Sequence, residues 1–290
     1  MTIVAAVALA VTGAVCFGLA AYLQHDAVRR DRLRRAVRRP GWLVGLALIG
    51  PGAALHAVAL ALAPLVVVQP IGVLALPLVA ALHARSARIR LGGAARLAIA
   101  ATALGVALFV WVAAAGVADS AAPLSAYTRV IWLAALATAA LVTLGAVGRG
   151  RRRCLAFATG AGVAFALVSV VVRGLGHHFA TGGRDVPLIL VLTLVAALAV
   201  GGVLVQLGYA SGPPAVVVAC LTIVDPLVSV GAGIGLLGET SASATGWTVG
   251  VGAACALLAV AGTLALARHH PEAAARSTPI THPVKEPSCI

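Results

Sequence analysis

Long apolar runs alternate with short polar segments along almost the whole chain. A helix that crosses the hydrocarbon core of a bilayer needs about 20 apolar residues. Runs of this kind predict nine membrane-spanning helices, near residues 2–24, 41–63, 65–84, 97–118, 128–148, 155–173, 187–207, 215–237 and 246–267. The pattern therefore predicts an all-α integral membrane protein with a Pro-rich polar tail over 268–290, which we expect to be disordered.

Arginine is concentrated in three of the polar segments. Residues 25–40 carry seven arginines, residues 85–96 carry four, and residues 149–154 carry four more. Because Lys and Arg accumulate in the cytoplasmic loops of membrane proteins, this distribution predicts an outside N-terminus and a cytoplasmic C-terminus. We expect the cell membrane of a bacterium as the location, with the bilayer and its anionic inner-leaflet lipids as partners.

Two further polar features lie at the outer end predicted for the sixth span. We expect Arg173 to extend its long side chain to the membrane interface. His177 and His178 follow within the predicted outer loop 174–186. Two adjacent histidines are a weak signal for a metal site, and we expect them to be solvated.

The composition excludes several classes of protein. Hydrophobic residues make up 61% of the chain and charged residues 10%, against about 25% charged residues in soluble globular domains. The net charge of +13 does not indicate nucleic-acid binding, because the arginines flank apolar runs and lack interleaved aromatic residues. The five cysteines are scattered without a CxxC spacing, so we expect no disulfide framework, no metal site and no cofactor.

A short apolar pattern occurs twice. Pro64 and Pro77 recur as Pro213 and Pro226, both at an offset of 149 residues and both within similar apolar runs. The copies fall in the third and eighth predicted spans, which cross the membrane in opposite directions.

This recurrence predicts an inverted repeat. We expect a first repeat of four helices over 1–127 and a second of five helices over 128–267. Inverted repeats are typical of secondary transporters, whose substrate site lies near the membrane midplane between the repeats.

Asp225 is the one carboxylate near the centre of a predicted span. A charged residue there costs about 2.5–3.5 kcal/mol on insertion scales, so we expect it to face the bundle interior. It could bind a proton or cation during transport, or it could cap a half-helix that begins at Pro226. Thr222, one turn earlier, could contribute to either role.

Three prolines lie within the apolar runs. Pro70, Pro77 and Pro226 each remove the hydrogen bond to the carbonyl four residues earlier. Free carbonyls at membrane depth are tolerated where protein or a water-filled cavity satisfies them. Each proline could be a packing kink, or the prolines could mark broken helices beside a cavity.

Three uncharged or weakly basic side chains complete the candidate site. Gln69, His56 and Gln206 could line a substrate path, or they could bridge neighbouring helices by hydrogen bonds. We expect no catalytic residue, because an aspartyl pair, an HExxH motif and a Gly-x-Ser-x-Gly motif in a suitable context do not occur.

Several of these residues carry a resemblance to a known family. The turn at Ala63-Pro64 and the run from Asp225 to Ser229, followed by Gly235-Leu-Leu-Gly-Glu239, resemble the drug/metabolite transporter superfamily and its EamA-type repeat. Those proteins usually have ten helices in two inverted repeats. Nine helices and a Gly-rich first helix before a basic loop are similar to the NIPA-like branch, which is associated with magnesium transport. The first repeat departs from the pattern, because residues 85–90 stand where a Leu-Gly-Glu ending is expected.

The resemblance and the repeat together imply a secondary transporter of a small solute or metabolite that works by alternating access. A magnesium or divalent-cation transporter is one alternative, and a non-transporting membrane assembly factor is another. The sequence is also compatible with a homodimer.

Overall fold

The computed structural model describes residues 2–30, 39–86, 88, 90–116, 122–212, 214–239 and 246–268. Within these ranges there is no strand, and nine helical segments are long and apolar enough to cross a membrane. The chain is therefore an all-α integral membrane protein, as its apolar runs predict. The expected disorder of the tail concerns residues beyond 268, which lie outside the described part.

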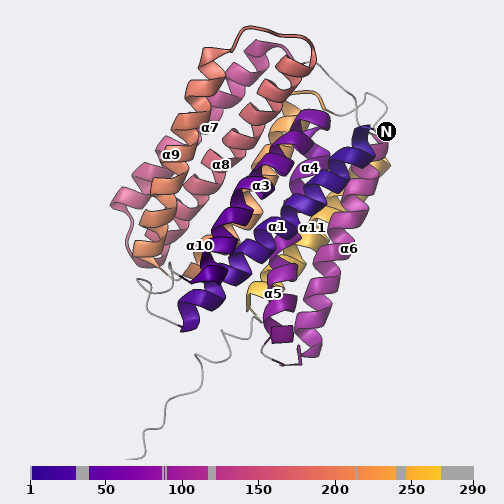
Figure 1. Cartoon of the computed structure of the whole chain (residues 1–290). Helices are drawn as coiled ribbons and strands as arrows, with labels where there is room; N and C mark the ends of the chain where they lie inside the picture. Colours follow the sequence, from indigo (N-terminus) through magenta and orange to yellow (C-terminus); the bar gives the residue numbers. More distant parts are fainter. Residues whose placement is uncertain are drawn as a thin grey trace, which may run out of the picture.

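The helices run up and down the bundle in chain order (Figure 1). Those of the first half are α1 (Thr2–Arg30), α3 (Pro40–Leu62), α4 (Leu65–Gly72), α5 (Ala75–Ser86) and α6 (Gly93–Ala115). Those of the second half are α7 (Leu124–Val147), α8 (Gly150–Ala180), α9 (Leu188–Ser211), α10 (Pro214–Gly235) and α11 (Gly246–Arg268). Helices α4 and α5 together form one predicted span.

The arginine-rich segments join helices at one end of the bundle. They follow α1, α5 and α7 and precede α3, α6 and α8, whose ends lie together at the bottom of Figure 1. We call this the arginine end. The opposite end, where α3 turns into α4 and where α10 ends, is called the far end.

The offset of 149 residues also relates the helix bounds. When the bounds of α1 and α3 are shifted by 149 residues, they match those of α8 and α9 to within one residue. The shifted bounds of α4–α5 are those of α10. For α6 and α11 both bounds differ by four residues from this offset. Each related pair runs in opposite directions (Figure 1). These are the relations that an inverted repeat requires, and the division at residue 127 stays a prediction.

Equivalent helix crossings are packed in the same way. In α3, a Cβ added to Gly52 would lie 3.2 Å from the Phe17 ring of α1. In α9, a Cβ added to Gly201, the residue 149 positions later, would lie 3.0 Å from the Phe165 ring of α8. A glycine therefore receives an aromatic ring of the preceding helix in both halves, although Phe17 and Phe165 are 148 and not 149 residues apart.

The first half has two short helices, α4 and α5, where the second half has one continuous helix, α10. Helix α4 ends at Gly72 and α5 begins at Ala75, and the Leu76 N–H donates to the Val73 carbonyl at 3.2 Å. In a continuous helix the N–H of residue 77 would donate to the Val73 carbonyl, but Pro77 has no N–H. The Leu76 N–H takes its place. Helix α10 runs unbroken through Pro226. The interpretation of Asp225 as the cap of a half-helix is therefore wrong.

Helix α8 lies at the centre of the second half and is longer than the predicted span 155–173. It packs against α3, α7, α9 and α10, and it is the most buried of the spans. Its glycines serve close packing, since a Cβ on Gly174 would meet the Tyr127 ring of α7 and one on Gly176 would meet Ala61 of α3.

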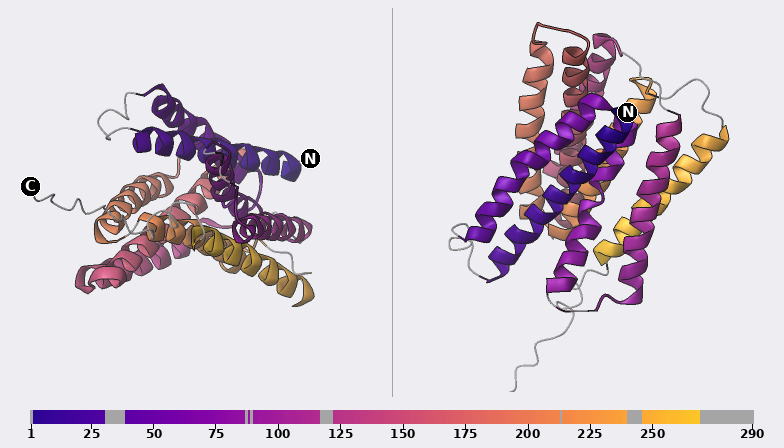
Figure 2. Two further views of the ribbon diagram at one scale, coloured as in Figure 1. Left: turned by 90° about the horizontal axis from the view of Figure 1, so that it is seen from below. Right: turned by 45° about the vertical axis from the view of Figure 1, so that its right-hand side comes forward.

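The extension of α8 changes the expectation for His177 and His178. They lie in the last turn of this helix and not in a loop, and His178 Nε2 is 2.7 Å from the Asp185 carbonyl oxygen. Figure 2 shows the remaining arrangement, in which α1 packs on α3 and α6 packs on α11.

The predicted orientation can be tested with two exposed positions at opposite ends. Arg90 lies between α5 and α6 at the arginine end, and Arg184 follows α8 at the far end. In a variant without native cysteines, we expect a membrane-impermeant thiol reagent to label Arg184→Cys in intact cells and Arg90→Cys only after permeabilisation. The reverse labelling pattern would invert the topology.

Candidate functional site

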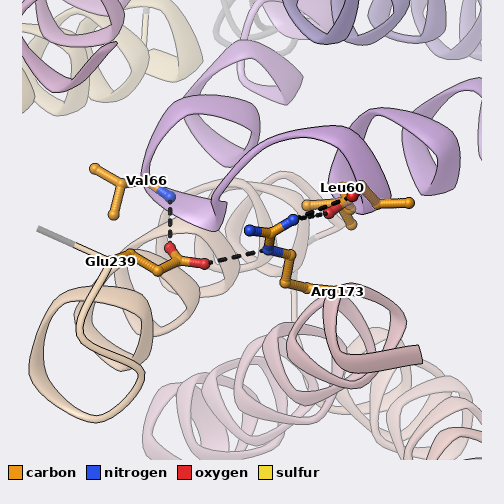
Figure 3. A network of polar contacts seen from close by, with 5 residues as sticks. Leu60, Val66, Arg173 and Glu239 are labelled. Atoms are coloured by element: carbon orange, nitrogen blue, oxygen red, sulfur yellow. Dashed lines mark hydrogen bonds and ion pairs between the residues drawn. The ribbon is translucent and has the colours of Figure 1, made fainter. Parts of the chain in front are cut away.

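A buried ion pair lies at the far end of the bundle (Figure 3). Arg173 belongs to α8, and Glu239 follows the end of α10. The distance from Arg173 Nε to Glu239 Oε1 is 3.5 Å, and the two side chains are 5% and 3% exposed. The pair is therefore shielded from solvent by the surrounding helices.

Each charge of this pair also meets the end of a helix. Arg173 Nη1 donates to the carbonyl oxygens of Leu60 and Ala61 in the last turn of α3, at 3.2 Å each. Glu239 Oε2 accepts a hydrogen bond of 3.3 Å from the Val66 N–H in the first turn of α4. A helix ends with unpaired carbonyls and partial negative charge and begins with unpaired N–H groups and partial positive charge. The pair therefore matches both ends of the α3–α4 turn, and we call these contacts the latch.

Local backbone geometry positions Glu239. Gly238 has a φ of 66°, a left-handed conformation that favours glycine, and the Glu239 N–H donates to the Gly233 carbonyl at 3.0 Å. A Cβ on Gly233 would collide with the Glu239 carboxylate. Gly233 at the end of α10 and Gly238 in the Gly-Leu-Leu-Gly-Glu run therefore direct the carboxylate toward α4.

The expectation that Arg173 reaches the membrane interface is wrong. The residue is 4% exposed, because α8 continues beyond it and the α3–α4 turn covers it. The sequence carried a partial signal, since Arg173 is an arginine within an otherwise apolar stretch and Glu239 ends a repeat-like motif. Nothing in their local sequence indicates that the two residues meet.

Burial raises the pKa of the Glu239 carboxyl, although Arg173 and the N–H groups of Leu65 and Val66 act in the opposite direction. Desolvation therefore opposes the ionised form even beside its partner. The net stability of such a pair over separated, hydrated charges is small.

Asp225 lies deeper in the bundle, where α10 packs against α8. Ser229 Oγ donates to Asp225 Oδ1 at 3.2 Å and lies 3.5 Å from the Ala166 carbonyl oxygen of α8. The helices approach closely here, because a Cβ on Gly162 of α8 would lie 2.7 Å from Val224 Cβ. The expectation that the carboxylate faces the bundle interior is therefore consistent with its contacts.

A cavity of about 80 Å³ lies between α4, α6, α10 and α11. Three of the predicted site residues line it, namely Pro70 from α4 and Thr222 and Pro226 from α10. Val73, at the break between α4 and α5, and Phe109 of α6 form further parts of the wall. The walls are almost wholly apolar, because the hydroxyls of Thr222 and Thr263 each donate to a carbonyl of their own helix at 2.8 Å.

The other predicted residues lie elsewhere. His56 packs edge-on against the Phe17 ring at the contact between α1 and α3, with ring centroids 6.5 Å apart. Gln206 is exposed on the outer surface of α9, so it does not line a path through the interior. Pro77 is buried within α5.

Gln69 is 4% exposed in α4, next to the cavity residue Pro70. The side-chain amide nitrogen Nε2 of Gln69 is buried. Among the described residues, it has no hydrogen-bond partner. An unpaired amide at this depth is costly, and a bound polar group or water would satisfy it.

No group of three or more His, Cys, Asp or Glu residues that could hold a metal ion occurs in the described part of the chain. Comparison with protein-family models, with curated proteins and with solved structures gives no match to this chain. A functional proposal therefore has to rest on the geometry of the bundle.

Loss of one member of the latch should destabilise the protein. Glu239→Ala removes the carboxylate from a buried guanidinium, and breaking one partner of a buried pair costs about 3–5 kcal/mol. We expect a lower thermal midpoint for the purified protein in detergent. Asp185→Ala, which changes an exposed acid at the same end, should leave the midpoint unchanged.

A charge-swapped variant separates the two contributions to the latch. In Arg173→Glu/Glu239→Arg, a carboxylate would face the α3 carbonyls and a guanidinium would face the Val66 N–H. We therefore expect the double variant to remain destabilised. Full recovery of the midpoint would show that only the attraction between the two charges matters.

Proposed function

We propose that this protein is a secondary transporter of a small organic solute, similar in design to the drug/metabolite transporter superfamily, with alternating access at the boundary between two inverted repeats. The observation that carries this proposal is the cavity whose wall comes from both halves. Helices α4 and α6 contribute one side, and α10 and α11 contribute the other. A movement of one half against the other would change the shape and access of this cavity.

The walls suit an apolar or amphipathic solute. Pro70, Phe109 and Pro226 present hydrocarbon surface, and both threonine hydroxyls of the wall are engaged with their own helices. A cavity of about 80 Å³ is small in this state, so a solute would enter when the halves separate.

Asp225 is the candidate coupling group. It lies on the helix that lines the cavity, one residue before Pro226, with a hydroxyl partner in Ser229. A carboxylate in an apolar bundle is more easily neutralised by a proton than in water. Proton binding and release there would couple solute movement to a proton gradient.

The break between α4 and α5 supplies a point of bending. Val73 and Leu74 separate the two helices, and Val73 lines the cavity. Hinges of domain movements are a few residues at the ends of elements. A rotation at this break would move the wall without unfolding either helix.

A magnesium or divalent-cation path is the alternative substrate class. It requires several oxygen ligands, typically carboxylates and waters. The cavity wall contains no carboxylate among the described residues. The apolar wall thus favours an organic solute, and a non-transporting assembly factor would need no cavity at all.

A thermal-shift screen of the purified protein is the direct test of solute binding. Binding to the native state raises the thermal midpoint, by an amount that grows with ligand concentration. Organic cations, amino acids, polyamines and divalent metals should be compared. A rise with metals alone would support the cation alternative, and no rise with any class would support the assembly factor.

The coupling role of Asp225 predicts a loss of transport on neutralisation. Asp225→Asn keeps the shape of the side chain but cannot bind and release a proton. With the solute found in the screen, we expect gradient-driven uptake into proteoliposomes to be abolished while the thermal midpoint changes little. Ser229→Ala, which removes only the partner hydroxyl, should reduce uptake partially. Uptake that persists in Asp225→Asn would assign this carboxylate a structural role.

The prolines predict a separate effect on rate. Pro77→Ala would allow α4 and α5 to join, because it restores the N–H that a continuous helix needs. We expect slower uptake without a lower thermal midpoint. Pro51→Ala in α3 is a matched control, since it removes a helix-interior proline away from the cavity wall. A loss of folding in Pro77→Ala would indicate that the break is only architectural.

A further inference from the structure

The latch joins the two halves of the bundle at the far end. Arg173 belongs to the second half and donates to Leu60 and Ala61 of the first, while Glu239 of the second half accepts from Val66 of the first. Separation of α3–α4 from α8 and α10 at this end must break all of these contacts together (Figure 3). These contacts hold the two halves together at the far end in this structure.

The chemistry of the latch permits reversible opening. Two charges that separate into water regain their hydration, which offsets much of the attraction that they lose. The helix ends of the α3–α4 turn would also bind water when exposed. Removing one member of the latch by mutation therefore costs much more free energy than separating both members into water.

The inverted repeat provides a comparison at the arginine end. The offset of 149 residues relates Arg173 to Gln24, near the end of α1, and Glu239 to Arg90, before α6. Glutamine carries no charge, so these two positions cannot form an ion pair. Arg90 is exposed, and Gln24 Cγ packs within 3.0 Å of the place where Gly45 of α3 would carry a Cβ.

We propose that the latch is a gate that closes the far end, whereas the arginine end opens without breaking an ion pair at the related positions 24 and 90. The proposal rests on the proposed transport function and deepens it by assigning the gate. The protein then favours the state that is closed at the far end. Entry of a solute from that side depends on release of Arg173 from Glu239.

The test uses the accessibility of a single cysteine in the cavity wall. Val73→Cys is introduced into full-length protein without native cysteines and reconstituted in oriented vesicles. A water-soluble, membrane-impermeant thiol reagent is added from one face at a time. In Glu239→Gln, we expect labelling from the far end to accelerate about tenfold, within the range typical of conformational couplings.

Two matched variants control for general loosening. Arg90→Gln changes the related position at the arginine end, and Asp185→Asn neutralises an exposed acid at the far end. Both should label at the rate of the parent. Equal acceleration from both faces in Glu239→Gln, or no acceleration, would overturn the proposal.

A second variant covers the case in which Glu239→Gln does not fold. Glu239→Asp keeps the charge but withdraws the carboxylate by one methylene, so labelling from the far end should accelerate to a smaller extent. If Glu239→Gln does not fold and the folded Glu239→Asp protein is labelled at the parent's rate, the latch has a purely structural role. Because labelling needs no solute, it reports on the gate even when Asp225→Asn shows that the transport proposal fails.

Discussion

Interrupted backbone inside an apolar environment needs hydrogen-bond partners, and the architecture of this bundle depends on how it supplies them. Where α3 ends and α4 begins, water is excluded, so Arg173 satisfies the final carbonyls of α3 and Glu239 satisfies an N–H of α4. The two side chains also neutralise each other, at a distance of 3.5 Å. A buried turn that would otherwise be costly thereby becomes one of the contacts between the two halves.

The two halves keep the same helix crossings but differ at the α4–α5 break and at the latch. Gly52 and Gly201 both receive an aromatic ring, which preserves the pairs α1–α3 and α8–α9. The break between α4 and α5 has no counterpart in α10, and the positions related to Arg173 and Glu239 hold Gln24 and Arg90, which cannot form an ion pair with each other.

Part of the candidate site was predictable from the sequence. Pro70, Thr222 and Pro226, which the sequence marks as unusual within apolar spans, line one cavity. Gln206 and His56 show the limit of that argument. Gln206 lies on the exposed face of α9 and His56 lies in the contact with Phe17, because the face that a residue occupies depends on how its helix is rotated against its neighbours.

The sequence by itself determined the all-α membrane class, the approximate spans and the offset that relates the two halves. The spans can be predicted because each must be apolar over its whole length. The offset can be predicted because two prolines recur at the same spacing in both halves. Only the tertiary structure decided that α8 continues to Ala180, that α10 passes unbroken through Pro226, and that Arg173 meets Glu239. A helix continues or breaks, and a buried charge is paired or exposed, according to side chains that distant segments bring to it, so these outcomes carry no local pattern.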